Sequence, residues 1–451
     1  MKKMKKMVAL MSVGIMLMMG LSACGGEEPK STESAEESTE STKSTDGDEA
    51  VESTDSTDGK KVTLTILRQT PQELDTQFEK EVIAEFEALH PNVKIDYQQM
   101  AYDSYITTLQ TKLASGDAPD IYLLETAYIE KYVENGYAAD LSNLESVKNI
   151  DEADLAKLRL EGKLYALGAT ASSMCVTYNK DAFEKAGITE IPETLDAFYD
   201  ACKKLQEAGY APIANGFKEG WTVSGNIQVD YITGVLAKDP EAIAGACDGS
   251  KPMSESELWK DEFQRFFDRY QYSNEDAFGT DWNNACSMLA TEKAGMVLNG
   301  SWTITSVLGL NPDVNIGVFA LPISNNAEDA KLLIQGPNGG WAAYQDSKNL
   351  DLAKEFIDYI SSVDVMSKEA KMCQTITVVK GAEAAEHPAI QDMLKYMEAD
   401  KVFRQGAIEH NFPNEQRDIF EKTLSEYLVN GNTSVDELCK QLDEEFARIA
   451  Q

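Results

Sequence analysis

The chain has 451 residues, 43% of them apolar, and a formal net charge of -35. This length is sufficient for two ordinary domains, and this acidity argues against a nucleic-acid partner, because phosphates would be repelled. The three histidines, His90, His387 and His410, form no HxxxH or HxH pair, so we expect no imidazole metal site. The phosphate loop GxxxxGKS/T, the GxSxG elbow and the GxGxxG fingerprint are absent from the sequence, which disfavours several enzyme classes. We therefore expect no catalytic residue and no cofactor.

The amino terminus has the three parts of a lipoprotein signal. Four lysines in the first six residues precede an apolar run, residues 7–20, which is too short for a stable membrane span. The tetrapeptide LSAC at 21–24 resembles the bacterial lipoprotein box, in which cleavage precedes the cysteine and that cysteine carries lipid. We predict a signal peptide at 1–23 and an acylated, palmitate-type anchor at Cys24 on the outer face of the cell membrane. The alternative is an ordinary signal peptide with an incidental cysteine.

Residues 25–60 are rich in Ser, Thr, Glu, Asp and Gly and contain almost nothing to bury. Such a segment stays disordered, and its acidity extends it. As a flexible chain it would span roughly 30–35 Å root-mean-square. We predict that 24–60 is a lipidated cysteine followed by an acidic tether; a regulatory binding tail is the alternative.

The folded part begins with strands that alternate with helices. The pattern predicts strands at 62–67, 93–97 and 121–124, each followed by a helix, the second and third at 102–114 and 128–134. The first helix carries an apolar face and stops before Pro91. Alternation of this kind is typical of an α/β layer with a mostly parallel sheet.

The stretch GMVLNGSW at 295–302 predicts a buried strand over 296–298, a turn at Asn299–Gly300 and a helix that begins at Ser301. In open α/β sheets, ligands bind at the edge where such a helix begins. A Trp at that point offers an apolar plate beside backbone N–H groups that have no helical partner. This combination suits a neutral, hydroxyl-rich molecule, unless Trp302 belongs only to the core.

Several phrases occur in an ordered series: HPNVKI at 90–95, ASGDAPDIY at 114–122, ENGYAADL at 134–141, EGKLYAL at 161–167, VTYNKDAFEKAGI at 176–188, GMVLNGSW at 295–302 and VNIGVFALP at 314–322. Together they resemble the extracellular solute-binding proteins of bacterial ABC importers, family 1, sugar-binding subgroup. Each phrase is moderately specific, and their order and spacing are strongly so. The resemblance covers about residues 62–450.

The resemblance implies an α/β, two-lobed periplasmic-binding-protein-like fold with hinge crossovers and a central cleft. It places the crossings near 172–177, 315–320 and 339–344. Lobe 1 would then comprise 61–173 plus 317–343, and lobe 2 would comprise 174–316 plus 344–451. The implied partners are a carbohydrate, an ABC permease and separate ATPase subunits, since this chain has no phosphate loop. We expect a monomer that touches the membrane only through its lipid anchor.

A sugar site needs aromatic plates and fixed hydrogen-bonding groups. By resemblance Trp302 is the stacking residue, and Trp341 follows a loop that enters a crossing strand. Polar candidates directly follow predicted strands, where parallel strands present their carboxyl ends. Asp281 has the alternative role of a helix N-cap. The full set of ligand-binding candidates is Trp302, Trp341, Trp221, Trp282, Asp281, Glu125, Thr126, Arg68, Gln69 and Asn338.

The leading hypothesis is a lipid-anchored receptor that captures a mono- or oligosaccharide and performs no chemistry. A second hypothesis is a binding protein for another solute, such as a peptide or polyamine, because fold does not fix ligand. A third is a secreted glycoside hydrolase, which would need paired carboxylates about 5–10 Å apart. The six cysteines beyond Cys24 form no CxxC motif, and we expect free thiols.

Overall fold

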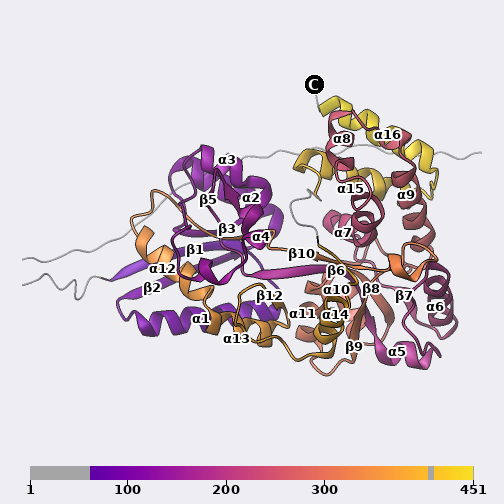
Figure 1. Cartoon of the computed structure of the whole chain (residues 1–451), viewed down its shortest axis with the longest axis horizontal. Helices are drawn as coiled ribbons and strands as arrows, with labels where there is room; N and C mark the ends of the chain where they lie inside the picture. Colours follow the sequence, from indigo (N-terminus) through magenta and orange to yellow (C-terminus); the bar gives the residue numbers. More distant parts are fainter. Residues whose placement is uncertain (1–60, 405–410, 450–451) are drawn as a thin grey trace, which may run out of the picture. The chain divides into compact units, whose positions relative to one another are not determined.

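The computed structural model describes residues 61–404 and 411–449. The signal peptide 1–23, Cys24 and the tether 24–60 therefore lie outside the described residues. Within the described part, a four-stranded and a seven-stranded β-sheet with separate hydrophobic cores form two lobes, and β4 and β5 make a further two-stranded sheet (Figure 1). The two-lobed α/β fold predicted from the sequence is confirmed.

Lobe 1 contains a four-stranded sheet of order β11-β3-β1-β2. β1 pairs in parallel with β2 and β3, and β11 pairs antiparallel with β3. Helices α2 and α1 cover opposite faces of this sheet (Figure 1). The elements of lobe 1 are β1 (Val62–Gln69), α1 (Glu73–Leu89), β2 (Val93–Met100), α2 (Tyr102–Ser115), β3 (Ile121–Glu125), α3 (Ile129–Glu134), α4 (Glu152–Leu155), β4 (Arg159–Leu160), β5 (Lys163–Leu164), β11 (Gly339–Ala343), α12 (Leu350–Ile360) and α13 (Val363–Cys373).

The predicted periodicities explain these elements. α1 buries Phe78, Val82 and Phe86 on one face and ends at Leu89, with His90 as its C-cap residue immediately before Pro91. Asp120 receives hydrogen bonds from the backbone N–H and the hydroxyl of Thr65, at 2.7 and 2.8 Å, and thereby ties the entry of β3 to β1.

Lobe 2 contains a seven-stranded sheet in which β13, β10, β6, β8 and β7 lie in that order, while β9 and β12 pair with β6. Two cores flank this sheet. Its elements are β6 (Thr170–Asn179), α5 (Lys180–Lys185), α6 (Leu195–Glu207), β7 (Ala211–Ile213), α7 (Gly220–Tyr231), α8 (Ala242–Asp248), α9 (Glu257–Tyr270), α10 (Trp282–Ala290), β8 (Ala294–Gly300), α11 (Trp302–Leu310), β9 (Ile316–Phe319), β10 (Leu332–Gln335), β12 (Ile376–Thr377), α14 (Pro388–Glu398), β13 (Val402–Arg404), α15 (Asn414–Val429) and α16 (Val435–Ile449).

The turn predicted at Asn299–Gly300 is wrong, because β8 continues through both residues. They pair antiparallel with Cys175 and Met174 of β6, and this ladder overrides their local preference for a turn. A Cβ at position 300 would lie 2.1 Å from the ring of Trp302, so a glycine is required where the indole crosses the strand end.

Of the predicted crossings, those near 172–177 and 339–344 lie at or within a few residues of connections in the structure, whereas the one near 315–320 is wrong. The first two connections are adjacent, because Ser172 at the start of β6 pairs with Gln335 at the end of β10. β9 does not cross; it pairs with β6 inside lobe 2. A third connection follows β12, since Cys373 belongs to the core of lobe 1 whereas Ala385 belongs to a core of lobe 2.

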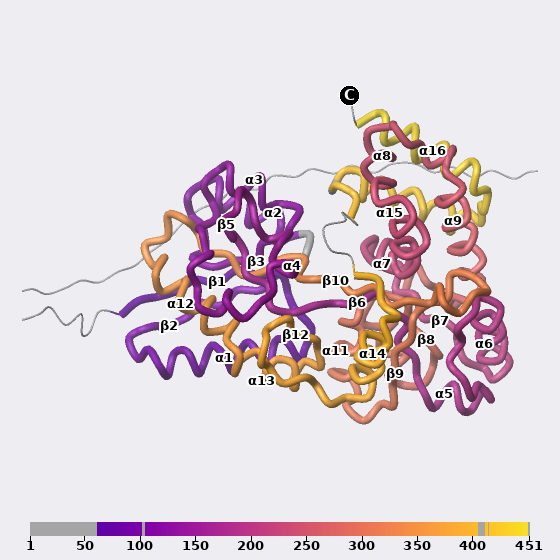
Figure 2. Tube along the Cα trace, in the orientation of Figure 1, coloured from indigo at the N-terminus to yellow at the C-terminus, as the bar shows by residue number. Residues whose placement is uncertain are grey.

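The predicted lobe boundaries therefore need correction. Residues 317–335 contribute β9 and β10 to the sheet of lobe 2 and not to lobe 1. Residues 344–373 pack in lobe 1 and not in lobe 2, because α12 and α13 bury Phe356, Ile357 and Met366 in its core. Figure 2 shows these orange helices beside the indigo α1, to which α13 makes extensive contact. The six cysteines of the described residues are free, as expected.

Candidate functional site

The carboxyl edge of the lobe 1 sheet gathers several predicted site residues. β1 ends at Gln69 and the parallel strand β3 ends at Glu125. β11 runs the other way, so its first residue, Gly339, pairs with Glu125. Thr126 secures this edge: its backbone N–H donates to the carbonyl of Asn338 (3.2 Å), and its hydroxyl donates to Asn338 Oδ1 (3.0 Å). Chain segments distant in sequence therefore meet at one rim.

Trp341 lies two residues into β11, with its backbone fixed on both sides. It pairs with Leu123 of β3, and it exchanges hydrogen bonds of 2.9 and 3.0 Å with Leu167. The guanidinium of Arg68 lies over its ring, with Cζ 5.5 Å from the centroid. The ring is half-buried and lines the cavity described below.

Four carboxyl groups and one guanidinium line the same region. Burial raises the pKa of Asp75, and Arg68 opposes this shift. Burial also raises the pKa of Glu79 well above its usual range, and it raises the pKa of Glu369 to about 8 with a further contribution from Asp75. Burial lowers the pKa of Arg68 to about 10, although the nearby Asp75 acts in the opposite direction and raises it. With Glu125, acidic groups outnumber the basic group by four to one.

Lobe 2 contributes the opposite wall through the first turn of α11. Ser301 donates its backbone N–H to the carbonyl of Ser173 (2.8 Å), which fixes the start of the helix to β6. Trp302 and Thr305 follow on the side that faces the cavity. Trp302 is half-buried and contacts both cores of lobe 2, so its indole is firmly seated.

These groups enclose a cavity of about 410 Å³ between the lobes. Its walls are the β1, β3 and β11 rim, helices α1 and α13, the start of α11, and the connecting segments 167–172 and 336–338. Of the predicted site residues, Trp302, Trp341, Glu125, Arg68, Gln69 and Asn338 line it. Thr126 does not line it but hydrogen-bonds Asn338, which does.

Three predicted site residues lie elsewhere in lobe 2. Asp281 caps α10, accepting the backbone N–H of Asn284 at 2.8 Å, which is the alternative role considered for it. Trp282 is 7% exposed and its indole N–H donates to Ser306 Oγ (3.4 Å), so it belongs to the core. Trp221 contacts Trp282 with its ring tilted by 56° and the ring centroids 5.1 Å apart, and it does not line the cavity.

The sequence did not identify the acidic residues Asp75, Glu79 and Glu369 as part of the cavity lining. Asp75 and Glu79 are four residues apart on α1, a spacing that puts them on one face, but nothing in the sequence marks that face as a cavity wall. Glu369 lies on α13, which had been assigned to the wrong lobe.

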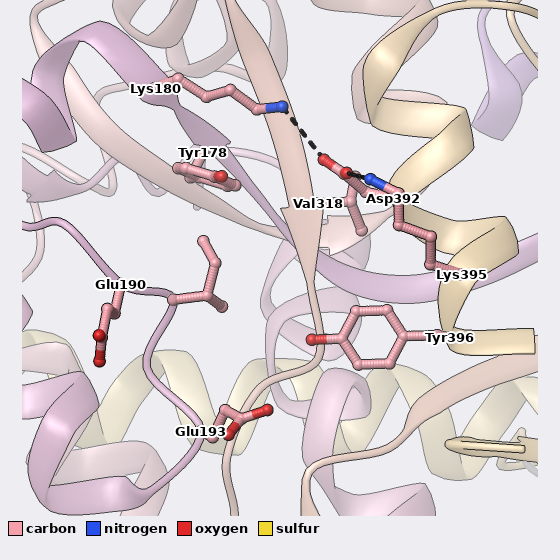
Figure 3. A pocket seen from close by; sticks show the side chains of 9 residues that line it. Tyr178, Lys180, Glu190, Glu193, Val318, Asp392, Lys395 and Tyr396 are labelled. Carbon is pink, nitrogen blue, oxygen red and sulfur yellow. Dashed lines mark hydrogen bonds and ion pairs between the residues drawn. The ribbon is translucent and has the colours of Figure 1, made fainter. Parts of the chain in front are cut away.

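A second cavity, of about 450 Å³, lies within lobe 2 (Figure 3). Asp392 stands between Lys180 and Lys395, at 3.2 and 3.0 Å, and Tyr178 lies beside them rather than in the cleft between the lobes. No tryptophan lines this second cavity. The cavity between the lobes is therefore the better candidate for a ligand with an apolar face.

Two further observations constrain the described part of the chain. No helix in residues 61–404 or 411–449 is long and apolar enough to cross a membrane. Over the same residues, no group of three or more His, Cys, Asp and Glu side chains is arranged to hold a metal ion.

Comparison with known proteins gives a family. Residues 70–366 match the family described as bacterial extracellular solute-binding protein, and the chain belongs to it. The Streptococcus mutans multiple sugar-binding protein is 26% identical over 76% of this chain and 81% of its own length. The Bacillus subtilis melibiose/raffinose/stachyose-binding protein MelE is 24% identical over 87% of this chain and 91% of its own length.

Solved structures agree on the fold. The solute-binding protein RafE in complex with raffinose superimposes with a TM-score of 0.73 at 22% identity, covering 86% of this chain and all of that one. A Bacillus licheniformis sugar transporter protein in complex with stachyose gives a TM-score of 0.71 at 20% identity, covering 86% of this chain and all of that one.

Proposed function

We propose that this protein captures a neutral mono- or oligosaccharide between its lobes and delivers it to an ABC permease, without chemical change. The observation that carries the proposal is that Trp302 and Trp341, one from each lobe, line one cavity. An indole face complements the C–H face of a sugar ring. The names of the relatives MelE and multiple sugar-binding protein support the same ligand class.

Polar groups around the indoles provide partners for hydroxyls. Gln69 Oε1 is buried at the cavity and has no hydrogen-bond partner within the described residues. Glu125, Asn338 and Ser301 supply further oxygen acceptors or donors at the rim. A sugar that leaves the buried Gln69 oxygen unpaired would bind more weakly, and this is the proposed source of selectivity.

Ligand capture would act by stabilising a closed arrangement of the lobes. A sugar that contacts Trp302 and Trp341 together interacts more strongly when the walls approach, so it shifts the population toward closure. The closed form would then dock on a permease whose ATPase subunits are separate chains. The protein would act as a monomer held at the outer face of the cell membrane by lipid on Cys24.

Calorimetric titration tests the ligand class. We expect binding of raffinose, stachyose or another neutral oligosaccharide, and no turnover of chromogenic glycosides. Binding of amino acids, peptides or polyamines without any sugar would refute the proposal. For the anchor, Cys24→Ala is expected to release the protein from the membrane fraction, and unchanged retention would rule the anchor out.

A further inference from the structure

Arg68 is held on three sides at the cavity wall. Its Nη1 forms an ion pair with Glu79, its Nε donates to the carbonyl of Gln69 at 2.9 Å, and its Cζ lies 5.5 Å from the centroid of the Trp341 ring. Its side chain is 12% exposed. A guanidinium with these contacts has little freedom to move toward a ligand.

The partner of Arg68 is itself fixed. Glu79 is 5% exposed, and its other carboxyl oxygen accepts a hydrogen bond from the Tyr97 hydroxyl. Tyr97 in turn accepts from Gln99 Nε2 at 2.9 Å. These contacts form a continuous chain of side chains from β2 through α1 and β1 to β11. The chain ends at the ring of Trp341, which lines the cavity.

The backbone of Trp341 is already set by its hydrogen bonds to Leu167 and its pairing with Leu123. The indole packs against the core of lobe 1, and the guanidinium of Arg68 lies over its ring. A guanidinium held at that place restricts the remaining rotation of the ring about its own bonds.

We infer that Arg68, clamped by Glu79, is a positioning residue that presets the ring of Trp341, rather than a cation that binds the ligand. The inference rests on the proposed function for the role of Trp341 as a sugar platform. The ring restraint itself exists without ligand and can be measured separately.

A double-mutant cycle measures the coupling in binding. With raffinose as the probe, Arg68→Met is expected to weaken binding about 10-fold, and Trp341→Phe to weaken it at least as much. In the Trp341→Phe background, Arg68→Met should cost less than about 3-fold, because the ring it positions is gone. Independent, multiplicative losses would overturn the inference.

Arg68→Lys separates positioning from charge compensation. Lysine retains a charge opposite Glu79 but has no plane to stack on an indole. We expect it to restore thermal stability relative to Arg68→Met while leaving binding weak. Full rescue of binding by lysine would show that Arg68 only neutralises Glu79.

The Arg68→Met, Glu79→Gln double variant removes the uncompensated carboxylate in case Arg68→Met alone folds poorly.

A ligand-free measurement keeps the inference testable if raffinose does not bind. Fluorine NMR of protein labelled with 5-fluorotryptophan gives signals from the five tryptophans, and Trp341→Phe assigns one of them. In Arg68→Met and Arg68→Lys, the Trp341 signal is expected to shift or broaden while that of Trp302 stays in place. The matched control, Asp392→Asn in the lobe 2 ion pair with Lys180, should move neither. An unmoved Trp341 signal in Arg68→Met would refute positioning, whereas absence of sugar binding with a moved signal would refute only the proposed function.

Discussion

Ser306 in α11 donates a hydrogen bond of 2.7 Å to the side-chain oxygen of Gln72, the residue that immediately precedes α1. A second bond, from Thr305 Oγ1 to the carbonyl of Cys373, also measures 2.7 Å. Both join lobe 2 to lobe 1 outside the connecting strands. The lobes are thus also joined by side-chain hydrogen bonds at one side of the cavity.

These contacts predict an effect on lobe closure. The Thr305→Val, Ser306→Ala double variant removes the two hydrogen bonds that join the lobes, worth about 1 kcal/mol each, and should widen the ligand-free distribution of lobe arrangements. We expect a larger radius of gyration by small-angle scattering and about 3- to 10-fold weaker sugar binding. An unchanged radius and affinity would show that the contacts do not influence closure.

The charged groups of the cavity lining predict selection by ligand charge. Among the described residues, the cavity lining offers an added negative charge no cation other than Arg68, which is already paired with Glu79, so a ligand carboxylate would be desolvated without compensation. Raffinose oxidised to a uronate at its terminal galactose should bind at least about 10-fold more weakly than raffinose. The Glu125→Gln variant should narrow this difference. Equal affinity for the two sugars would contradict the electrostatic account.

The raised pKa of Glu369 predicts a pH dependence of stability. Folded protein holds this proton up to about pH 8, whereas an unfolded chain releases it near the ordinary value of 4.5. Wild-type stability therefore falls, relative to Glu369→Gln, as pH rises from about 4.5 to 8. The difference in the free energy of unfolding between Glu369→Gln and the wild type, measured with urea, should therefore increase with pH. Because Glu369 is partly exposed, we expect an increase on the order of 2 kcal/mol over this pH range. Parallel stability curves for the two proteins would contradict the assignment.

The N-cap role of Asp281 gives a structural prediction. Asp281→Ala should lower the free energy of unfolding by about 1 kcal/mol, because the backbone N–H of Asn284 loses its acceptor. Asp281→Asn, which retains a capping oxygen, is the matched control and should cost less. Sugar affinity should be unchanged in both variants. A loss of sugar affinity without a loss of stability would instead show that Asp281 takes part in ligand binding.

The strands of lobe 1 were predictable because apolar periodicity and the stop at Pro91 are local signals. The place of β9 was not predictable, because β9 differs from a crossing strand only in the distant strand with which it pairs, which is β6. The assignment of α12 and α13 failed for the same reason: their apolar faces fit either core by composition, and only tertiary contact decides between them.

The site was predictable where it follows from strand ends. Gln69, Glu125 and Asn338 meet because parallel strands share an edge and β11 returns to it. Asp75 and Glu79 come from a helix face, and an amphipathic helix pattern does not reveal which polar residues border a cavity. The opposite error occurred at Trp282, which was predicted to bind ligand but is buried in the core. An aromatic residue near a helix start is equally compatible with either position.

The most direct test of the central claim is calorimetric titration of the wild type, Trp302→Ala and Trp341→Ala with raffinose and stachyose. The account predicts that the wild type binds these sugars, that each variant binds at least about 10-fold more weakly, and that both variants remain folded. Leu310→Ala, an exposed position at the far end of the Trp302 helix, should bind as the wild type does. Full affinity in both tryptophan variants, or a wild type that binds a charged solute and no sugar, would contradict it.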